Sequence, residues 1–374
     1  MELDLTNDQE LLRETTARFI ESTFPLSMVR QFADGDITLP TTYVRDAAAL
    51  GWFAMLVPEE YGGGSVSGEG VSDLAIIAEE RGRGLQPGPF VSTNVVAAAL
   101  AEAGSDAQRT SLLPAMVQGE QLATWVIGDA IGDWVPGATI SATARGDEFT
   151  VAGEADLVQD GVLADWLLVT AGGTEGLTQF LLPTGASGVT VTPLAGHDIT
   201  QRLARVTLDH LTLPASSLLG KADGADADVE RQLQLACVLT VSEAVGAMDA
   251  LFEMTRQYAI DRIAFGRPIG SFQAIKHQLA DLSLTLESSK AIAVAAVRAV
   301  QDRTPDAGEI ASMAKAWVGD AGIDIAQGCF QVFAGIGYTW EHDLHLFLRR
   351  MTMNGLLFGQ SDWHRERICR IQGV

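Results

Sequence analysis

Apolar residues recur at helical spacing through the first third of the chain. The segment Thr6-Asn7-Asp8-Gln9 has the form of a capping box, and an amphipathic run follows it. Pro58 and the glycines after it interrupt the pattern, because neither residue type continues a helix. Further apolar, helix-like segments cover residues 47–56, 74–80, 93–103 and 106–117. The pattern predicts an all-α N-terminal domain over residues 1–118.

The middle of the chain changes to short β-like runs separated by turn signals. Residues 205–213 alternate with period 2, as a half-buried strand does. Gly172-Gly173 and Pro193 are typical of the turns between strands. The other runs cover residues 149–152, 166–170, 180–182 and 189–192. Strands without helices between them predict an antiparallel sheet or small barrel over residues 119–221.

Helical spacing returns from residue 222. Val245, Met248, Phe252 and Ala259 share one face of a predicted helix. Long helices joined by short turns predict an antiparallel four-helix bundle over residues 222–374. The predicted fold is therefore α+β, with an N-terminal helical domain, a middle antiparallel β-domain and the C-terminal bundle.

Composition and charge narrow the function. The chain of 374 residues is 47% hydrophobic and 20% charged, which is typical of a folded soluble protein. Its 25 Lys and Arg against 48 Asp and Glu give a net charge of −23, which argues against binding nucleic acid or anionic membranes. We identify no secretory signal and no apolar stretch near the roughly 18 residues of a membrane span.

The cysteines indicate a reducing compartment. Cys237, Cys329 and Cys369 are odd in number and far apart, so they predict neither a disulfide framework nor a metal site. We expect a cytoplasmic protein without a bound metal.

Three motifs, in this order and spacing, resemble the acyl-CoA dehydrogenase family over nearly the whole chain. The first runs from Gly51-Trp52 to PEEYGG at 58–63. The second is YAIDRIAFG at 258–266 with FQAIKH at 272–277 and LAD at 279–281. The third is QVFAGIGYT at 331–339, ending at Arg349-Arg350. The resemblance implies the three-domain fold already predicted, FAD as cofactor, and dehydrogenation of an acyl-CoA thioester at its α and β carbons. An electron-transfer flavoprotein is the electron acceptor that the family implies.

The resemblance also implies residues for the FAD of a neighbouring subunit. An arginine suits a pyrophosphate, because its planar fork of donors matches phosphate oxygens, and glycines let the backbone approach closely. The matching residues are Arg262, Phe265, Phe272, Gln273, Gln331, Gly335 and Gly337. Taken singly, the arginine is also consistent with a helix surface and the phenylalanines with a core.

The motifs that contact the flavin ring in the family are altered. Residues 124–133 lack the family's Thr-Glu-Pro, although Asp129 and Asp133 offer polar groups. The family's Trp-Ile-Thr aligns with Leu157-Val158-Gln159, and an aliphatic side chain cannot stack on a ring as an indole does.

The family's catalytic glutamate is missing at both positions where it occurs. These positions hold Phe358 and Ala236, and an arginine beside the second is replaced by Cys237. The substitutes that we considered are Glu243, Asp362, His364, Glu341 and His342. Each also has a structural interpretation: a buried polar contact for Glu243, a helix cap for Asp362 and His364, and a turn for the last two.

We therefore hypothesise a subunit of an FAD-dependent acyl-CoA dehydrogenase that relies on a paralogous partner for the catalytic carboxylate, as in some actinobacterial members of the family. One alternative is a self-sufficient homo-oligomer whose base has moved, for example to Glu243 or Asp362. Another is a non-catalytic scaffold subunit. A third is other flavin chemistry, on an acyl carrier protein or a nitroalkane.

Overall fold

The predicted capping box starts the first helix. The Thr6 hydroxyl accepts a hydrogen bond from the backbone N–H of Gln9, and Gln9 Oε1 accepts one from the backbone N–H of Thr6, both at 3.2 Å. The computed structural model describes residues 5–129 and 134–374. The N-terminal helices are α1 (Asn7–Thr23), α2 (Leu26–Asp34), α3 (Thr41–Ala49), α4 (Gly70–Arg83), α5 (Phe90–Ala103) and α6 (Asp106–Val117).

A sheet follows these helices. Its strands are β1 (Ala123–Val126), β2 (Ile140–Arg145), β3 (Glu148–Gln159), β4 (Trp166–Gly172), β5 (Leu177–Pro183), β6 (Val189–Leu194), β7 (Leu203–Pro214) and β8 (Leu218–Leu219). The order is β6-β7-β3-β2-β4-β5-β8, with β1 paired to β4. The five predicted runs lie in β3 to β7.

Most strand pairs are antiparallel, as predicted; the exceptions are β1, and one residue pair of β2, which run parallel to β4. All four residues of β1 are buried, so the strand shows no alternation of apolar and polar positions. Its sequence therefore gave no period-2 signal. After the antiparallel pair of β2 and β3, the chain enters β4, which lies beside β1 and runs in the same direction.

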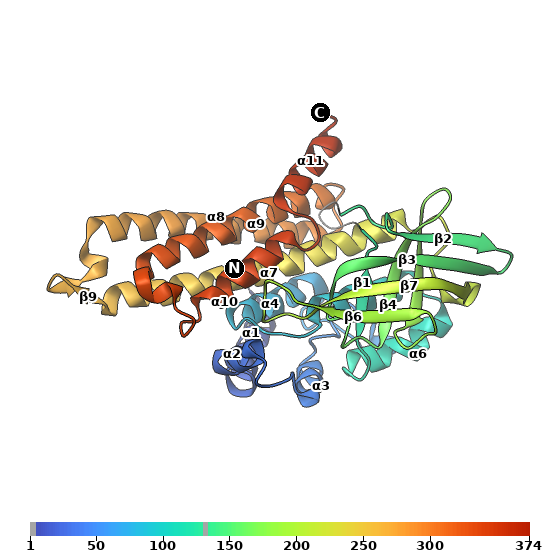
Figure 1. The fold of residues 1–374 in the computed structure, drawn as a ribbon, viewed down its shortest axis with the longest axis horizontal. Helices are drawn as coiled ribbons and strands as arrows, with labels where there is room; N and C mark the ends of the chain where they lie inside the picture. The colour runs from blue at the N-terminus through green and yellow to red at the C-terminus, as the bar shows by residue number, and fades with distance from the viewer. Residues whose placement is uncertain (1–4, 130–133) are drawn as a thin grey trace.

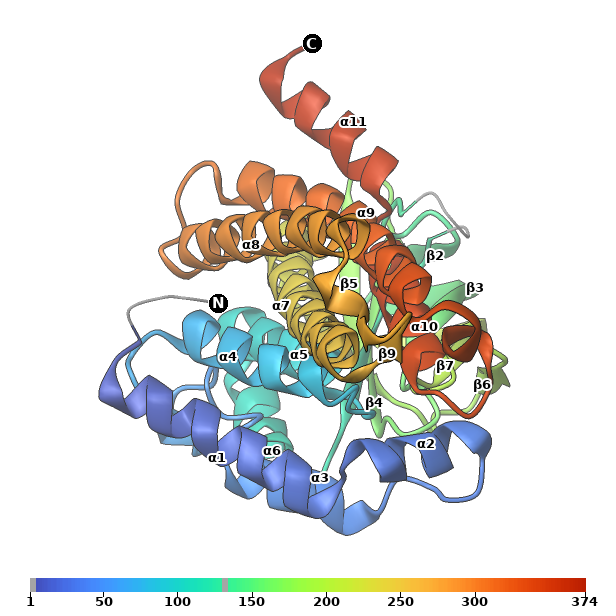
Figure 2. The same cartoon turned by 90° about the vertical axis from the view of Figure 1, so that its left-hand side faces the viewer.

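The C-terminal helices form the bundle. They are α7 (Asp226–Asp261), α8 (Gln273–Gln301), α9 (Ala307–Phe333), α10 (Leu344–Leu356) and α11 (Ser361–Gln372). A short hairpin of β9 (Ile263–Ala264) and β10 (Arg267–Pro268) joins α7 to α8, and the 3-10 helix η4 (Ala334–Tyr338) follows α9. Figure 1 shows the bundle along the long axis, with the sheet at one end and the hairpin at the other. In Figure 2, α11 projects away from the bundle.

Helix α7 is the apolar centre of the molecule. It contains an 18-residue window with a mean hydropathy of 1.6, so by length and composition it passes as a membrane span, contrary to the sequence prediction. Within the described residues, 83% of that window is buried inside the protein. The window is apolar because α4, α5 and the bundle helices surround it.

Two glycines bring α4 and α7 into close contact. A Cβ added at Gly82 would lie 1.9 Å from the backbone oxygen of Glu243, and one added at Gly246 would lie 1.9 Å from that of Glu79. Only glycine permits this approach. The crossing places Arg81 of α4 next to Glu243 of α7.

Candidate functional site

The hairpin end of the molecule, defined here as residues 262–273 together with 331–338, gathers the residues that match the family's contacts to a neighbouring FAD. The rings of Tyr258 on α7 and Phe333 on α9 stack at 4.3 Å. Since Arg262 follows Tyr258 by one turn and Gln331 precedes Phe333 by two residues, both motifs lie at the same end of the bundle. The side chains of Arg262, Gln273 and Gln331 are exposed there, as is Gly335.

The turn of the hairpin is strained in a way that exposes an aromatic ring. Phe265 and Gly266 both have positive φ, 54° and 79°, as in the two-residue turns that join adjacent strands. Glycine tolerates this conformation, whereas phenylalanine rarely adopts it. Phe265 is 95% exposed, and its ring meets Phe272 edge-on at 6.2 Å. A strained, exposed aromatic residue indicates a binding role rather than a core position.

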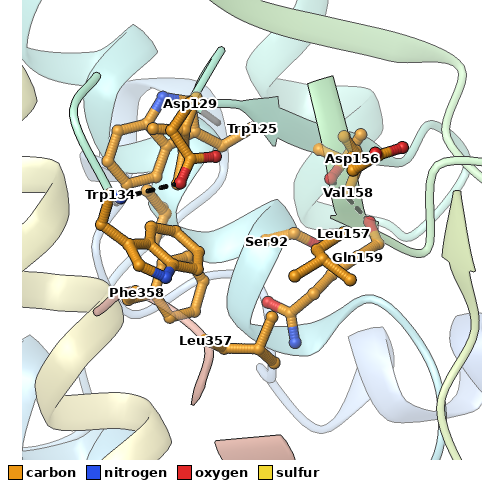
Figure 3. A pocket seen from close by; sticks show the side chains of 13 residues that line it. Ser92, Trp125, Asp129, Trp134, Asp156, Leu157, Val158, Gln159, Leu357 and Phe358 are labelled. Carbon is orange, nitrogen blue, oxygen red and sulfur yellow. Dashed lines mark hydrogen bonds between the residues drawn. The ribbon is translucent and has the colours of Figure 1, made fainter. Parts of the chain in front are cut away.

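A second pocket lies on the side of the bundle that faces the sheet. This sheet-side pocket is lined by residues of α5, of β1 and the segment after it, of β3, and of the loop after α10 (Figure 3). Among them are Leu157, Val158 and Gln159, the residues that align with the family's flavin-contacting motif. The space left between the side chains is about 20 Å³, enough for a water molecule but not for a ring system.

Phe358 closes this pocket. Its ring stacks on Trp125 at 6.3 Å with an interplanar angle of 18°, and contacts Trp134 at 5.6 Å. The Phe358 side chain is 6% exposed, and Figure 3 shows the three rings together on one wall of the pocket. Aromatic rings therefore fill the place where the family resemblance puts a catalytic carboxylate.

The structure brings the family's two base positions together. Ala236 is fully buried, and the Sγ atom of its neighbour Cys237 lies 3.9 Å from the carbonyl oxygen of Phe358. Nε2 of His364 donates to the same carbonyl at 3.0 Å. Burial lowers the pKa of His364 to about 3, so the ring is neutral and its Nδ1 has no hydrogen-bond partner in the described part of the chain.

A buried lysine fixes the loop that carries Phe358. Nζ of Lys315 donates to the carbonyl oxygens of Gly355 at 3.1 Å and Gly359 at 3.0 Å. Burial lowers the pKa of Lys315 to about 8. Phe358 and Gly359 have φ angles of 59° and 100°, so the loop turns sharply at this point. Lys315 thus fixes the backbone of this loop, and the residue that the loop carries at position 358 is apolar.

Glu243, one of the possible substitutes, lies in a buried cluster of charges. Its Oε1 is 3.6 Å from Nε of Arg81 and 3.9 Å from Nη1 of Arg350. Arg350 also pairs with Asp198 at 2.7 Å, and both side chains are completely buried. Burial raises the pKa of Asp160 beside them to about 7. Glu243 is seven residues, about 10 Å, along α7 from Ala236 and is held by two arginines.

The other substitutes lie outside the sheet-side pocket. The Asp362 side chain is 89% exposed in the first turn of α11 and pairs with Arg365 at 2.8 Å. Glu341 is exposed, and Nδ1 of His342 accepts a hydrogen bond from the backbone N–H of Leu344 at 3.2 Å. His364 does not cap α11, as one interpretation had it; it is buried beneath Phe358.

Two carboxylates that sequence reasoning did not propose as bases line the pocket. Asp156 on β3 receives two hydrogen bonds from Arg205, at 2.6 and 2.8 Å. Asp129 accepts a hydrogen bond from the backbone N–H of Trp134 at 3.0 Å. Asp133 lies outside the described residues. Nothing in the spacing of Asp156 indicated the pocket, because the sheet, and not a local motif, places it there.

The two regions differ in their fit to FAD. Among the described residues, the space between the side chains of the sheet-side pocket is too small for a flavin. The hairpin end instead presents exposed arginine, glutamine, phenylalanine and glycine. The two regions are also far apart: 26 residues of continuous helix separate Ala236 from Arg262, about 39 Å.

Comparisons with known proteins identify the family. The model of the acyl-CoA dehydrogenase N-terminal domain matches residues 6–120, and that of the C-terminal domain matches residues 223–372. The chain is 30% identical over 346 residues to acyl-CoA dehydrogenase IpdE2 of Mycobacterium tuberculosis, an alignment that covers 92% of this chain and 90% of the relative. The chain belongs to the acyl-CoA dehydrogenase family.

Solved structures of the family share the complete fold. The ChsE4-ChsE5 complex from Mycobacterium tuberculosis has a TM-score of 0.90 at 24% identity, covering 100% of this chain and 99% of that one. The Tcur3481-Tcur3483 steroid ACAD, solved as a variant, has a TM-score of 0.88 at 26% identity, covering 98% and 97%. This acyl-CoA dehydrogenase chain thus has the N-terminal helices, middle sheet and C-terminal helices of its family, as predicted.

Proposed function

We propose that the chain is a subunit of a cytoplasmic, FAD-dependent acyl-CoA dehydrogenase and that a paralogous subunit supplies the catalytic carboxylate. In this assembly the hairpin end of the chain contacts the FAD held by the partner. The substrate is an acyl-CoA thioester, dehydrogenated at its α and β carbons, and an electron-transfer flavoprotein accepts the electrons.

The observation that carries this proposal is Phe358. Removal of the α proton of a thioester needs a positioned base, which a phenyl ring cannot provide. The ring is packed between Trp125 and Trp134, so the position is part of the core and not a loop awaiting a substrate. The base then has to come from another chain or from another residue.

The hairpin end supports the heteromeric arrangement. Arg262 is exposed, and no hydrogen bond or ion pair of its guanidinium occurs within the described residues, so its donors are available to a phosphate. FAD bound by the partner brings the difficult redox chemistry, since it accepts the hydride from the β carbon. Two of the similar solved structures carry the names of two subunits, which agrees with an assembly of unlike chains.

The self-sufficient homo-oligomer remains the second candidate, and one observation favours it: Asp129 and Asp156 line the sheet-side pocket. The pairing of Asp156 with Arg205 opposes it, since a carboxylate bound by a guanidinium is a weak base. Glu243 and Asp362 are poorer candidates, because one is held by two arginines and the other is exposed at the start of α11.

The test is dehydrogenase activity measured with acyl-CoA thioesters and an artificial electron acceptor. We expect the chain alone to be inactive and the chain co-purified with a paralogue to be active. Replacing the partner's catalytic carboxylate by its amide is expected to abolish the activity. Activity of the chain alone, lost on Asp129→Asn, would instead establish the self-sufficient enzyme.

A further inference from the structure

A cavity of about 330 Å³ lies between the N-terminal helices and the bundle. This interdomain cavity is lined by the loop after α3, the residues around the start of α4, one side each of α5 and α7, and the end of α8 with the segment after it. A volume between about 300 and 1,000 Å³ is typical of small-molecule sites. Within the described chain, the cavity shares no lining residue with the sheet-side pocket.

The geometry of α7 separates the interdomain cavity from the sheet-side pocket. Arg231 and Leu235 line the cavity, and because they are four residues apart they share one face of the helix. Cys237, whose Sγ atom contacts the carbonyl oxygen of Phe358, follows Leu235 by two residues, about 200° around the helix axis. The interdomain cavity and the pocket that Phe358 closes therefore lie on opposite sides of α7.

The charged residues of this lining, among those that the structure describes, are Arg231, Arg303 and Glu102. Oε1 of Glu102 accepts a hydrogen bond from Nη2 of Arg303 and lies 3.9 Å from Nε of Arg231. Nη1 of Arg231 donates to the carbonyl oxygen of Val300 at 2.8 Å, whereas its buried Nε has no hydrogen-bond partner in the described part of the chain. One carboxylate thus serves two guanidinium groups, so the lining keeps a positive charge in a chain whose net charge is −23.

The surroundings of Arg231 favour a second anion. Its side chain is 15% exposed, and burial together with the charge of Arg303 lowers the pKa of Arg231 to about 10. Two like charges in a partly buried place repel each other, and a further carboxylate would relieve that repulsion. Oε1 of Gln301 accepts a hydrogen bond from the backbone N–H of Val71 at 2.8 Å, which leaves the amide N–H groups of Gln301 as additional donors at the cavity wall.

Apolar side chains and an unsatisfied positive charge together select one class of ligand. An inorganic anion would leave the apolar wall in contact with water, and a plain hydrocarbon would leave the guanidinium groups without a second partner. A monocarboxylate with a short apolar chain satisfies both, because the arginine fork matches a carboxylate and the chain covers apolar surface. The buried apolar residues of the wall, each at most 5% exposed, are Met55, Val57, Val71, Ala98 and Leu235.

We propose that the interdomain cavity binds a free carboxylic acid with a short apolar chain. The carboxylate pairs with Arg231 and Arg303, and the chain lies against the apolar wall formed by Val71 and Leu235. The site goes beyond the proposed function, because the ligand is an acid and not a thioester, and because binding needs neither FAD nor a partner subunit. The bound acid contacts α4 and α5 on one side and α7 on the other, so it links the N-terminal helices to the bundle.

The test is isothermal titration of the purified chain with acetate, hexanoate and hexylamine. We expect hexanoate to bind at least about tenfold more tightly than acetate, since each buried methylene contributes about fourfold. Hexylamine, which carries the opposite charge on the same chain, is expected not to bind. Arg231→Gln and Arg303→Gln are each expected to weaken hexanoate binding about tenfold, and Arg303→Lys less. The matched control Arg298→Gln removes an exposed arginine in the last turn of α8, outside the cavity lining, and is expected to leave binding unchanged.

Three results would overturn the proposal: absence of hexanoate binding at millimolar concentration, equal binding of hexanoate and hexylamine, or equal hexanoate binding by the wild type and Arg303→Gln. Arg303 keeps the test decisive if Arg231→Gln does not fold, because the Arg303 side chain is 58% exposed. Each of the three results would leave the proposed function intact, because that function is judged on the dehydrogenase activity of the complex with its partner.

Discussion

Aromatic and arginine side chains occur at both the sheet-side pocket and the hairpin end. They are buried at the pocket and exposed at the hairpin end. In the first, Phe358 is 6% exposed and packed against two tryptophans; in the second, Phe265 is 95% exposed at a strained turn. The buried Arg350 near the first is paired with Asp198, whereas Arg262 at the second has no partner among the described residues. An aromatic or cationic side chain stabilises the fold when it is packed and paired, and is available for binding when it is not.

The largest effect is expected from Arg350. The Arg350→Met substitution removes the partner of the fully buried Asp198 and leaves that carboxylate without its cation. Breaking a buried pair on one side typically costs about 3–5 kcal/mol of unfolding free energy. Denaturant unfolding of the wild type and the variant measures this loss of unfolding free energy. The control Arg365→Met removes an exposed arginine and is expected to cost below about 1 kcal/mol; equal losses would contradict the view of a closed, structural cluster.

Phe358 and Phe265 provide the most direct contrast between the two regions. Phe358→Ala is expected to destabilise the chain by about 3 kcal/mol, because it leaves a cavity beside Trp125 and Trp134. Phe265→Ala is expected to change stability by less than about 0.5 kcal/mol, since its ring is exposed. Thermal and denaturant unfolding of both variants measure this. A small loss for Phe358→Ala would show that the sheet-side pocket is an open site.

His364 makes the sheet-side region sensitive to acid. Its pKa in the folded chain is about 3, below the ordinary value of about 6.5, so below pH 6.5 the unfolded chain binds a proton that the folded chain does not. Stability is therefore full above pH 6.5 and falls as the pH falls toward 3. Between pH 6.5 and 5 we expect a loss of about 2 kcal/mol.

The control for this pH effect is His364→Gln, which has no titrating ring. Unfolding free energies of the wild type and the variant are compared at both pH values. The variant is less stable at pH 6.5 but loses about 2 kcal/mol less on acidification. Parallel losses in the two proteins would show that other groups cause the acid sensitivity.

Substitutions at the hairpin end are expected to have the smallest effect on stability. There we expect a loss of FAD binding instead. Arg262→Gln is expected to leave the unfolding free energy unchanged and to weaken FAD binding by the complex with its partner about tenfold, through loss of a charged hydrogen bond. The FAD content of the complex after dialysis measures this binding. The control is Arg18→Gln, which removes an exposed arginine far from the hairpin in sequence. Unchanged FAD content in Arg262→Gln would favour the scaffold interpretation.

Local signals predicted much of the fold. The capping box at Thr6 and the helices expected at 74–80, 93–103 and 106–117 are found, because capping and helical spacing are properties of neighbouring residues. The expected helix-like segment at 47–56 is wrong, since α3 ends at Ala49 and turns follow it. Strand β1 was missed, since a strand buried on all sides shows no alternation. The parallel pairing of β1 with β4 depends on where the chain returns, and no short segment encodes it.

The candidate site was predicted only in part. The motif residues at 262–273 and 331–337 do lie at one end of the bundle, but their role in cofactor binding stays a prediction. The closure of the other pocket depends on Trp125, Trp134 and Phe358, which are far apart in sequence and meet only in the fold. The same holds for the cluster of Glu243, Arg81 and Arg350, which lie on three different helices.

The central claim is that the sheet-side pocket of this chain holds no flavin and that its hairpin end completes the FAD site of another subunit. The amount of FAD per polypeptide tests it most directly, measured from the visible spectrum of the chain purified alone and with a paralogous partner. The account predicts a colourless, folded chain alone and one FAD for each pair of chains in the complex. One FAD per chain in the protein purified alone would contradict it.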